Sequence, residues 1–153
     1  MSSLHKVDIE LAKLLPLITE QLEAGKTVTF SPMGVSMLPM LRQGKDSIVL
    51  SPAPERLKKY DLPLYRRDNL KFVLHRVVEA GYTYTCIGDN QFVYEEGIRP
   101  DQIIGVVSGF YRGDKYHSVS EFSYRAYCIF WHRTRGIRHF YRRGKSWLRR
   151  HIG

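Results

Sequence analysis

The chain has 153 residues, of which 43% are apolar and 12% aromatic, and this size and composition favour one globular domain over a disordered chain. The sequence contains no apolar run of about 18 residues, which excludes a transmembrane helix on sequence grounds. Residues 1–10 also lack the basic start and apolar stretch of a secretion signal. We therefore expect a cytoplasmic protein.

The net charge of +9 lies in the C-terminal segment. Residues 1–121 carry equal numbers of acidic and basic side chains, whereas residues 122–153 carry nine Lys and Arg and no acidic residue. This asymmetry predicts an anionic partner for that segment and not for the whole protein.

The N-terminal part is predicted to be helical over residues 8–25. Leucine and isoleucine side chains recur near one helical face, Asp8 is a candidate cap, and Gly25 is a candidate terminus. Pro16 lies inside this helix, where it either kinks the helix or divides it into two.

From residue 27 onward the pattern changes to short segments that alternate in polarity. Turn-forming residues 67–70 predict a hairpin loop, and residues 55–59 predict a single helical turn. Strands are predicted over residues 27–30, 47–50, 62–66, 71–80, 82–87 and 103–111. We therefore expect a mostly β domain over residues 27–121, a curved antiparallel sheet or partly open barrel, preceded by a helical segment over residues 1–26.

Residues 122–153 form an aromatic and basic tail that is predicted to be helical. Three interpretations remain open. The tail contacts an anionic membrane surface, it binds nucleic acid or an acidic peptide, or it is a basic helix that packs its aromatic side chains on the β domain. Nucleic acid ranks last, because no base-reading motif accompanies the charge.

The cysteines, Cys86 and Cys128, show neither a disulfide framework nor the spacing of zinc ligands. We expect both to be small apolar groups or free thiols. Cys86 lies in a predicted strand without special flanking residues, so cysteine catalysis ranks low.

Ser36 lies in a segment, residues 31–39, that is rich in proline and glycine and follows a predicted strand. Such a segment restricts its backbone and leaves short side chains accessible. An exposed serine hydroxyl is a candidate nucleophile, although serine is also common in plain turns.

His75 lies in the predicted strand over residues 71–80, and both faces of this strand are largely apolar. The histidine is therefore either a general base or a hydrogen-bonded core residue. Its neighbour Arg76 requires a partner if it is buried. Asp89, in the Gly-Asp-Asn stretch that closes the next predicted strand, is the candidate partner, although the same stretch also fits a simple hairpin turn.

The order Gly-x-Ser-Met-x-Pro over residues 34–39, then His-Arg-Val-Val over residues 75–78, then Gly-Asp-Asn over residues 88–90 resembles the signal peptidase and LexA-like serine peptidase superfamily. The resemblance covers residues 28–111. Bacterial signal peptidases carry a lysine before the arginine, whereas archaeal and endoplasmic-reticulum enzymes carry a histidine there. His75 is similar to the second type.

The resemblance implies that Ser36 is the nucleophile and His75 the general base. It places Asp89 on the aspartate of the family's Gly-Asp-Asn box and Glu95 where the family usually has a further aspartate that orients the histidine. The remaining residues that match the motifs are assigned to structural support of the site: Gly34, Met37, Pro39, Arg76 and Asn90.

The sequence departs from the family at several points, among them Met40, where threonine often follows the proline, and Lys45-Asp46, where a Gly-Asp pair is common. Glu95 is one methylene longer than the usual aspartate, and Gly34 replaces the hydroxyl residue that many bacterial members carry two positions before the nucleophile. The membrane anchor of a signal peptidase is not seen in the sequence, so the family's location and substrates are not carried over.

The sequence therefore predicts a small cytoplasmic serine endopeptidase, peripheral at the membrane if residues 122–153 bind lipid. It would cleave a leader-like or signal-like peptide or protein without a metal or an organic cofactor. The alternatives are a non-catalytic peptide-binding adaptor of the same fold and a repressor-related regulator, which lacks support because no helix-turn-helix segment is present.

Overall fold

The computed structural model describes residues 3–151, with the side chains of residues 11–150. Residues 1–2 and 152–153, which the predicted helical segment and tail include, lie outside the described residues. The helices are α1 (Ser3–Glu23), α2 (Phe122–Arg133) and α3 (Arg135–His151), with a 3₁₀ turn η1 (Pro100–Gln102). The strands are β1 (Val28–Phe30), β2 (Asp46–Ser51), β3 (Pro63–Arg66), β4 (Phe72–Leu74), β5 (Arg76–Ala80), β6 (Tyr84–Ile87), β7 (Glu95–Ile98), β8 (Ile103–Arg112) and β9 (Lys115–Ser118).

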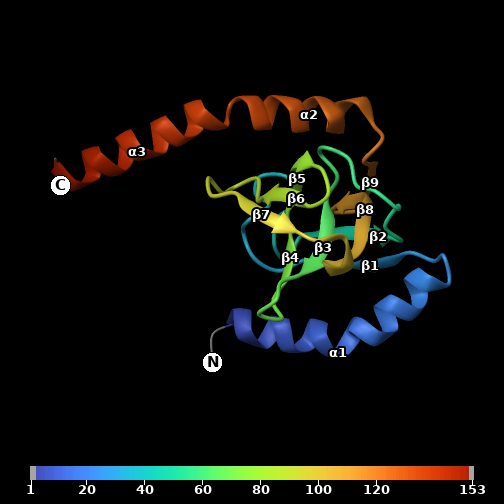
Figure 1. Cartoon of the computed structure of the whole chain (residues 1–153). Helices are drawn as coiled ribbons and strands as arrows, with labels where there is room; N and C mark the ends of the chain where they lie inside the picture. The colour runs from blue at the N-terminus through green and yellow to red at the C-terminus, as the bar shows by residue number, and fades with distance from the viewer. Residues whose placement is uncertain (1–2, 152–153) are drawn as a thin grey trace.

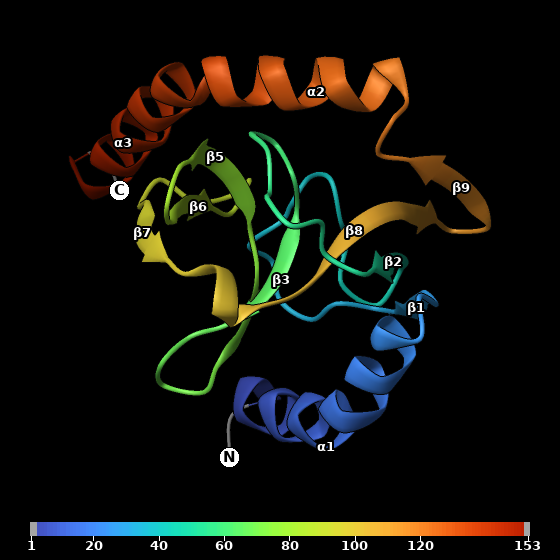
Figure 2. The same cartoon turned by 45° about the vertical axis from the view of Figure 1, so that its right-hand side comes forward.

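The strands form two antiparallel sheets, which makes the protein mostly β. The larger sheet has the order β1-β2-β8-β3-β4, with β9 also paired to β8, and the smaller sheet has the order β5-β6-β7. The larger sheet does not close into a barrel, because β1 and β4 each pair with one neighbour only. Figures 1 and 2 show α1 on one side of the strands and α2 on the opposite side.

The predicted N-terminal helix is present as α1, and Pro16 lies inside it. Ile18 and Leu22 are the buried residues of its C-terminal half. Gly25 has a φ of +73°, and the N–H of Lys26 donates to the carbonyl of Gln21 at 2.9 Å. This left-handed end satisfies a free carbonyl of the last turn and explains why the helix ends beside a glycine.

The prediction of a single strand over residues 71–80 is wrong, because the structure has two strands in this segment. β4 pairs with β3 in the larger sheet, while β5 pairs with β6 in the smaller one, and His75 lies between them. Alternation of side chains cannot reveal this break, because both halves keep the period of two. His75 therefore lies at the junction of the two sheets and not inside a central strand.

Three further differences concern short segments. Residues 55–59 contain no helical turn, and β7 and β9 were not predicted. The acidic pair in β7 and the polar composition of β9 gave no apolar alternation, so pairing with β6 and β8 forms these strands.

The core has two parts that meet at the junction. The larger part packs α1, β2, β3, β8 and α2 together and includes Ile48, Leu50 and Cys128. The smaller part lies under β5, β6 and β7 and includes Tyr65, Val77 and Cys86. Because Tyr124 and Cys128 of α2 belong to the larger part, the core continues beyond residue 121. No helix among residues 3–151 has the length and apolar content to cross a bilayer.

Candidate active site

Ser36 lies in the loop between β1 and β2, and its neighbours in the sequence hold this loop on the core. Met37 and Met40 are buried, whereas Ser36 is only half-buried. Gly34 has a φ of +93°, which favours glycine, and its N–H donates to Gln43 Oε1 at 3.0 Å. The Leu38–Pro39 peptide bond is cis. The two methionines hold the loop on the core, and Ser36, which precedes Met37, keeps part of its surface exposed.

The Ser36 loop packs directly on the Gly-Asp-Asn turn after β6. The N–H of Asn90 donates to the Ser36 carbonyl at 2.8 Å, and Asn90 Nδ2 donates to the Val35 carbonyl at 3.1 Å. A Cβ on Gly88 would lie 2.7 Å from the Ser36 carbonyl oxygen, so only glycine permits this approach. Two of the three motifs that resemble the family, residues 34–39 and residues 88–90, are therefore in contact.

The expected pair between Arg76 and Asp89 is present and fully buried. Arg76 Nε and Nη2 donate to the two carboxylate oxygens of Asp89 at 2.8 Å each. Arg76 also donates to Tyr124 Oη at 2.8 Å, and Tyr127 Oη donates to Asp89 at 2.9 Å. The pair thus joins β5, the Gly-Asp-Asn turn and α2, which supplies the polar partners that a buried charge pair requires.

His75 is buried at the junction between β4 and β5, with one ring nitrogen facing a polar group of atoms. Nδ1 lies 3.4 Å from Tyr65 Oη and 3.7 Å from Glu95 Oε2. Nε2 has no hydrogen-bond partner among the described residues. It is also not one of the described side-chain atoms that are both fully buried and without a partner, so it keeps some exposure to solvent. Nε2 is therefore the ring nitrogen that remains open for proton exchange.

Glu95 is held in place from two directions. Arg67 donates to both of its carboxylate oxygens at 2.6 Å, and Tyr65 Oη donates to Oε2 at 3.0 Å. Burial favours the neutral acid, but these hydrogen bonds outweigh burial and hold the pKa of Glu95 below its usual value. Glu95 is thus a fixed carboxylate beside the Nδ1 edge of His75.

Burial lowers the pKa of His75 to about 4, although the negative charge of Glu95 acts in the opposite direction. The ring is consequently neutral at ordinary pH, which is the form that a general base requires. A histidine in water has a pKa near 6.5, so burial keeps the His75 ring neutral at more acidic pH than an exposed histidine.

Tyr65 and Arg67 belong to this group of residues, and the sequence analysis did not single them out. The hairpin predicted over residues 62–80 could have indicated Tyr65 as a neighbour of His75. Its register pairs Tyr65 with Val73, two positions before His75. The pairing of Arg67 with Glu95 has no such signal, because it depends on the unpredicted strand β7.

Ser36 and His75 are brought to the same region by the contacts of their neighbours. Ser36 contacts the Gly88 turn, Gly88 follows Ile87, and Ile87 pairs with Arg76 beside His75. Within the described part of the chain, no hydrogen bond joins Ser36 Oγ to the His75 ring. A hydrogen-bonded Ser36–His75 dyad is therefore not seen among the described residues.

The two cysteines are poor nucleophiles in this structure. Burial raises the pKa of the Cys86 thiol to about 12, and the nearby Glu95 charge adds to the effect. Burial also raises the pKa of Cys128, whose sulfur accepts a hydrogen bond from Arg76 at 3.0 Å. No group of three or more metal-binding side chains is found among the residues whose side chains are described.

An apolar groove of about 850 Å³ lies between α1 and the two edge strands of the larger sheet. Its β1 side continues through Ser31 and Pro32 to Met33, three residues before Ser36, and its β4 side ends at Leu74, the residue before His75. The remaining lining residues are Leu11, Leu14, Leu17, Ile18, Gln21, Thr27, Val28, Thr29, Phe30, Leu64 and Phe72. The groove therefore borders both of these strands close in sequence to the two candidate catalytic residues, although neither Ser36 nor His75 lines it.

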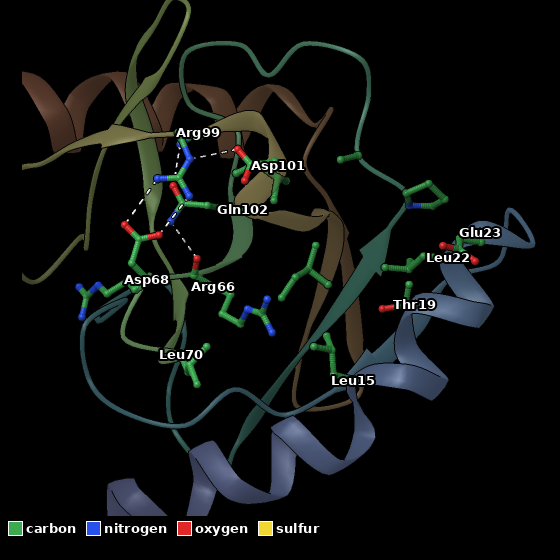
Figure 3. A pocket seen from close by; sticks show the side chains of 15 residues that line it. Leu15, Thr19, Leu22, Glu23, Arg66, Asp68, Leu70, Arg99, Asp101 and Gln102 are labelled. Carbon is green, nitrogen blue, oxygen red and sulfur yellow. Dashed lines mark hydrogen bonds and ion pairs between the residues drawn. The ribbon is translucent and has the colours of Figure 1, made fainter.

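A second cavity of about 570 Å³ lies elsewhere along α1 and has a different character (Figure 3). Arg99 pairs with Asp68 at 3.0 Å and with Asp101 at 3.2 Å, and Gln102 Nε2 donates to the Arg66 carbonyl at 3.0 Å. These polar groups pair with one another, and the cavity is also lined by Thr19, Glu23 and Arg66.

Comparison with protein-family models, with curated proteins and with solved structures finds no match for this chain.

Proposed function

We propose that this protein is a serine endopeptidase of the signal peptidase and LexA-like type, with the partly open β-barrel of that superfamily. Ser36 is the nucleophile and His75 the general base. The observation that supports this most is the state of His75, a buried neutral histidine held at Nδ1 by Tyr65 and Glu95 and open at Nε2.

In the proposed mechanism, Ser36 Oγ attacks the scissile carbonyl carbon while its proton passes to His75 Nε2. The imidazolium that forms lies beside the Glu95 carboxylate, whose charge stabilises it. The same proton then passes to the leaving amine, which departs and leaves an acyl-serine. Water, deprotonated by His75, hydrolyses this ester and returns the proton to Ser36.

The oxyanion of the tetrahedral intermediate requires donors near Ser36. The Ser36 N–H donates to no acceptor among the described residues, so it is free for this role. Because Gly34 carries no hydroxyl, backbone N–H groups would supply the stabilisation, and loss of one such donor typically costs about 3 kcal/mol of transition-state stabilisation.

The substrate would be an extended peptide that adds to a sheet edge. β1 and β4 each leave one edge unpaired, and the apolar groove runs between them. A peptide bound there would form main-chain hydrogen bonds with an edge strand and place alternate apolar side chains in the groove. This suits the apolar segments of leader-like and signal-like peptides.

A mass-spectrometric assay of a peptide library tests the proposal. The wild-type chain should cleave extended apolar peptides, and Ser36→Ala and His75→Gln should each lower turnover by roughly 10³-fold or more. Ser120→Ala is the matched control, since Ser120 is exposed in the turn before α2, and its turnover should equal that of the wild type.

The second candidate function is a peptide-binding adaptor, which the missing hydrogen bond between Ser36 and His75 favours. An adaptor would bind the same apolar peptides equally well in the wild-type chain and in Ser36→Ala, and neither would cleave them. Fluorescence anisotropy with labelled peptides, run beside the cleavage assay, distinguishes the two functions.

A further inference from the structure

Helix α3 is amphipathic, and its two faces are clearly separated. Apolar side chains recur at spacings of three and four residues along one face, and Arg and His side chains recur in the same way on the opposite face. The apolar residues, with their exposed fractions, are Ile137 (72%), Phe140 (82%), Tyr141 (69%), Trp147 (57%) and Leu148 (48%).

The polar face of α3 is the one that touches the rest of the protein. Arg138 lies 3.6 Å over the Trp131 ring and donates to the Trp131 carbonyl. His139 stacks on Phe92 with ring centroids 4.7 Å apart, and Arg142 reaches the Asn90 carbonyl at 3.4 Å. In its N-terminal half the helix therefore turns Arg138, His139 and Arg142 toward the rest of the protein and leaves its apolar face exposed, the reverse of a helix that packs on a core.

Helix α2 shows a related pattern. Tyr124 and Cys128 are buried and Trp131 donates to the Asp89 carbonyl at 2.7 Å, so this face is fixed on the β domain. Phe122 and Phe130 are exposed on its other side. Figure 1 shows α2 and α3 following one another along one side of the molecule, with α3 extending beyond the strands.

We propose that α2 and α3 form an in-plane membrane-binding arm that inserts its apolar face into the surface of a bilayer rich in anionic lipid. Phe, Tyr and Trp are the side chains that suit the boundary between head groups and acyl chains. The exposed cations at the margins of the apolar face, Arg143 and Lys145, then lie at the depth of the lipid phosphates.

The charge of residues 122–153 and the exposure of their apolar side chains favour a membrane over a second copy of the chain or a nucleic acid as the partner of this face. The segment from residue 122 onward has nine Lys and Arg and no acidic side chain, so pairing two copies along this face would bring like charges together. A nucleic acid would contact the exposed cations but would leave the exposed aliphatic side chains of Ile137 and Leu148 in water. An anionic membrane matches both the outward apolar face and the charge.

The test is cosedimentation of the full chain with vesicles. The wild type should sediment with vesicles of phosphatidylglycerol and phosphatidylcholine in equal parts, and far less with phosphatidylcholine alone. Replacing Phe140 and Leu148 by Ser should weaken binding by about tenfold or more per side chain. Arg143→Gln and Lys145→Gln should each weaken it by about fivefold.

Leu70→Asn is the matched control, because Leu70 is an exposed apolar residue at the β3–β4 turn (Figure 3), and its binding should equal that of the wild type. Brominated lipid should also quench the Trp147 fluorescence on binding, which attachment by charge alone would not produce. The proposal would be overturned if the wild type stays in the supernatant, if the Ser substitutions leave binding unchanged, or if bound protein shows no quenching. Ser36→Ala should bind vesicles as the wild type does, so this test is independent of the peptidase proposal.

Discussion

His75 is a buried base, and its burial has a consequence for stability. The unfolded chain binds a proton at this residue near pH 6.5, whereas the folded chain does so only near pH 4. Above pH 6.5 both states are neutral and this difference has no effect. As the pH falls from 6.5 to 4, the unfolded state gains protons and the folded state loses about 3 kcal/mol of relative stability.

We predict that His75→Gln removes this part of the acid sensitivity. Urea denaturation of the wild type between pH 7 and pH 4 should show a steeper loss of unfolding free energy than the variant shows. His117→Gln is the control, because His117 is partly exposed on β9 and should leave the steep loss in place. Equal slopes for the wild type and His75→Gln would contradict the buried neutral state.

Glu95 acts through its charge on His75, which makes it a positioning residue with a measurable signature. Glu95→Gln removes a negative charge 3.7 Å from Nδ1, so the pKa of His75 should fall further. The expected result is a lower kcat and an acid limb of the pH–rate profile shifted to lower pH. Glu96→Gln, a change at the exposed neighbouring position, should alter neither quantity.

At the residue scale, the motif spacing predicted more of the candidate site than composition did. The sequence placed Ser36, His75, Asp89 and Glu95 in one region only through the family resemblance. The Arg76–Asp89 pair also followed from simple chemistry, because a buried arginine requires a carboxylate. The contribution of Arg67 could not be foreseen, since it depends on long-range pairing.

At the scale of elements, the junction between β4 and β5 is the central feature. The chain passes from one sheet to the other at His75, and the next residue, Arg76, fixes β5 to the Gly-Asp-Asn turn. The Ser36 loop packs on the same turn. A single buried ion pair therefore positions both the strand that follows His75 and the turn that contacts the Ser36 loop.

We predict that separating this pair is costly. Arg76→Met alone should lower the unfolding free energy by about 3–5 kcal/mol, because it leaves Asp89 as an uncompensated buried charge. Combining it with Asp89→Leu should recover much of the loss. The control is Arg99→Met, which breaks an exposed pair with Asp68 and should cost about 1 kcal/mol or less. A double variant as unstable as the single one would contradict this account.

The elements that the sequence predicted are those with apolar alternation or clear ends, such as β2, β8 and α1. β7 and β9 are polar, and their strand conformation comes from pairing with β6 and β8. The break at His75 escaped prediction because the period of two continues through it. Local patterns thus specify strands better than they specify which sheet a strand joins.

At the scale of the whole molecule, the basic segment has two parts with different roles. α2 supplies Tyr124 and Cys128 to the core and donates to Asp89, whereas α3 keeps its apolar face exposed. The sequence predicted one tail from the change in charge, and charge does not distinguish a helix on the core from a helix that extends beyond it.

This difference predicts the result of two truncations. A chain ending at Thr134 keeps α2 and should retain a cooperative urea transition with a midpoint close to that of the full chain. A chain ending at Glu121 loses the partners of the Arg76–Asp89 pair and should unfold at markedly lower urea concentration. Equal midpoints for the two truncated chains would show that α2 does not stabilise the β domain.

The most direct test of the account is covalent labelling with a serine-reactive fluorophosphonate, followed by peptide mapping. The account predicts a single adduct on Ser36, lost in Ser36→Ala, and formed at a rate that falls as the pH drops through about 4 with the protonation of His75. An unlabelled wild-type chain at high probe concentration, or an adduct on any other serine, would contradict it.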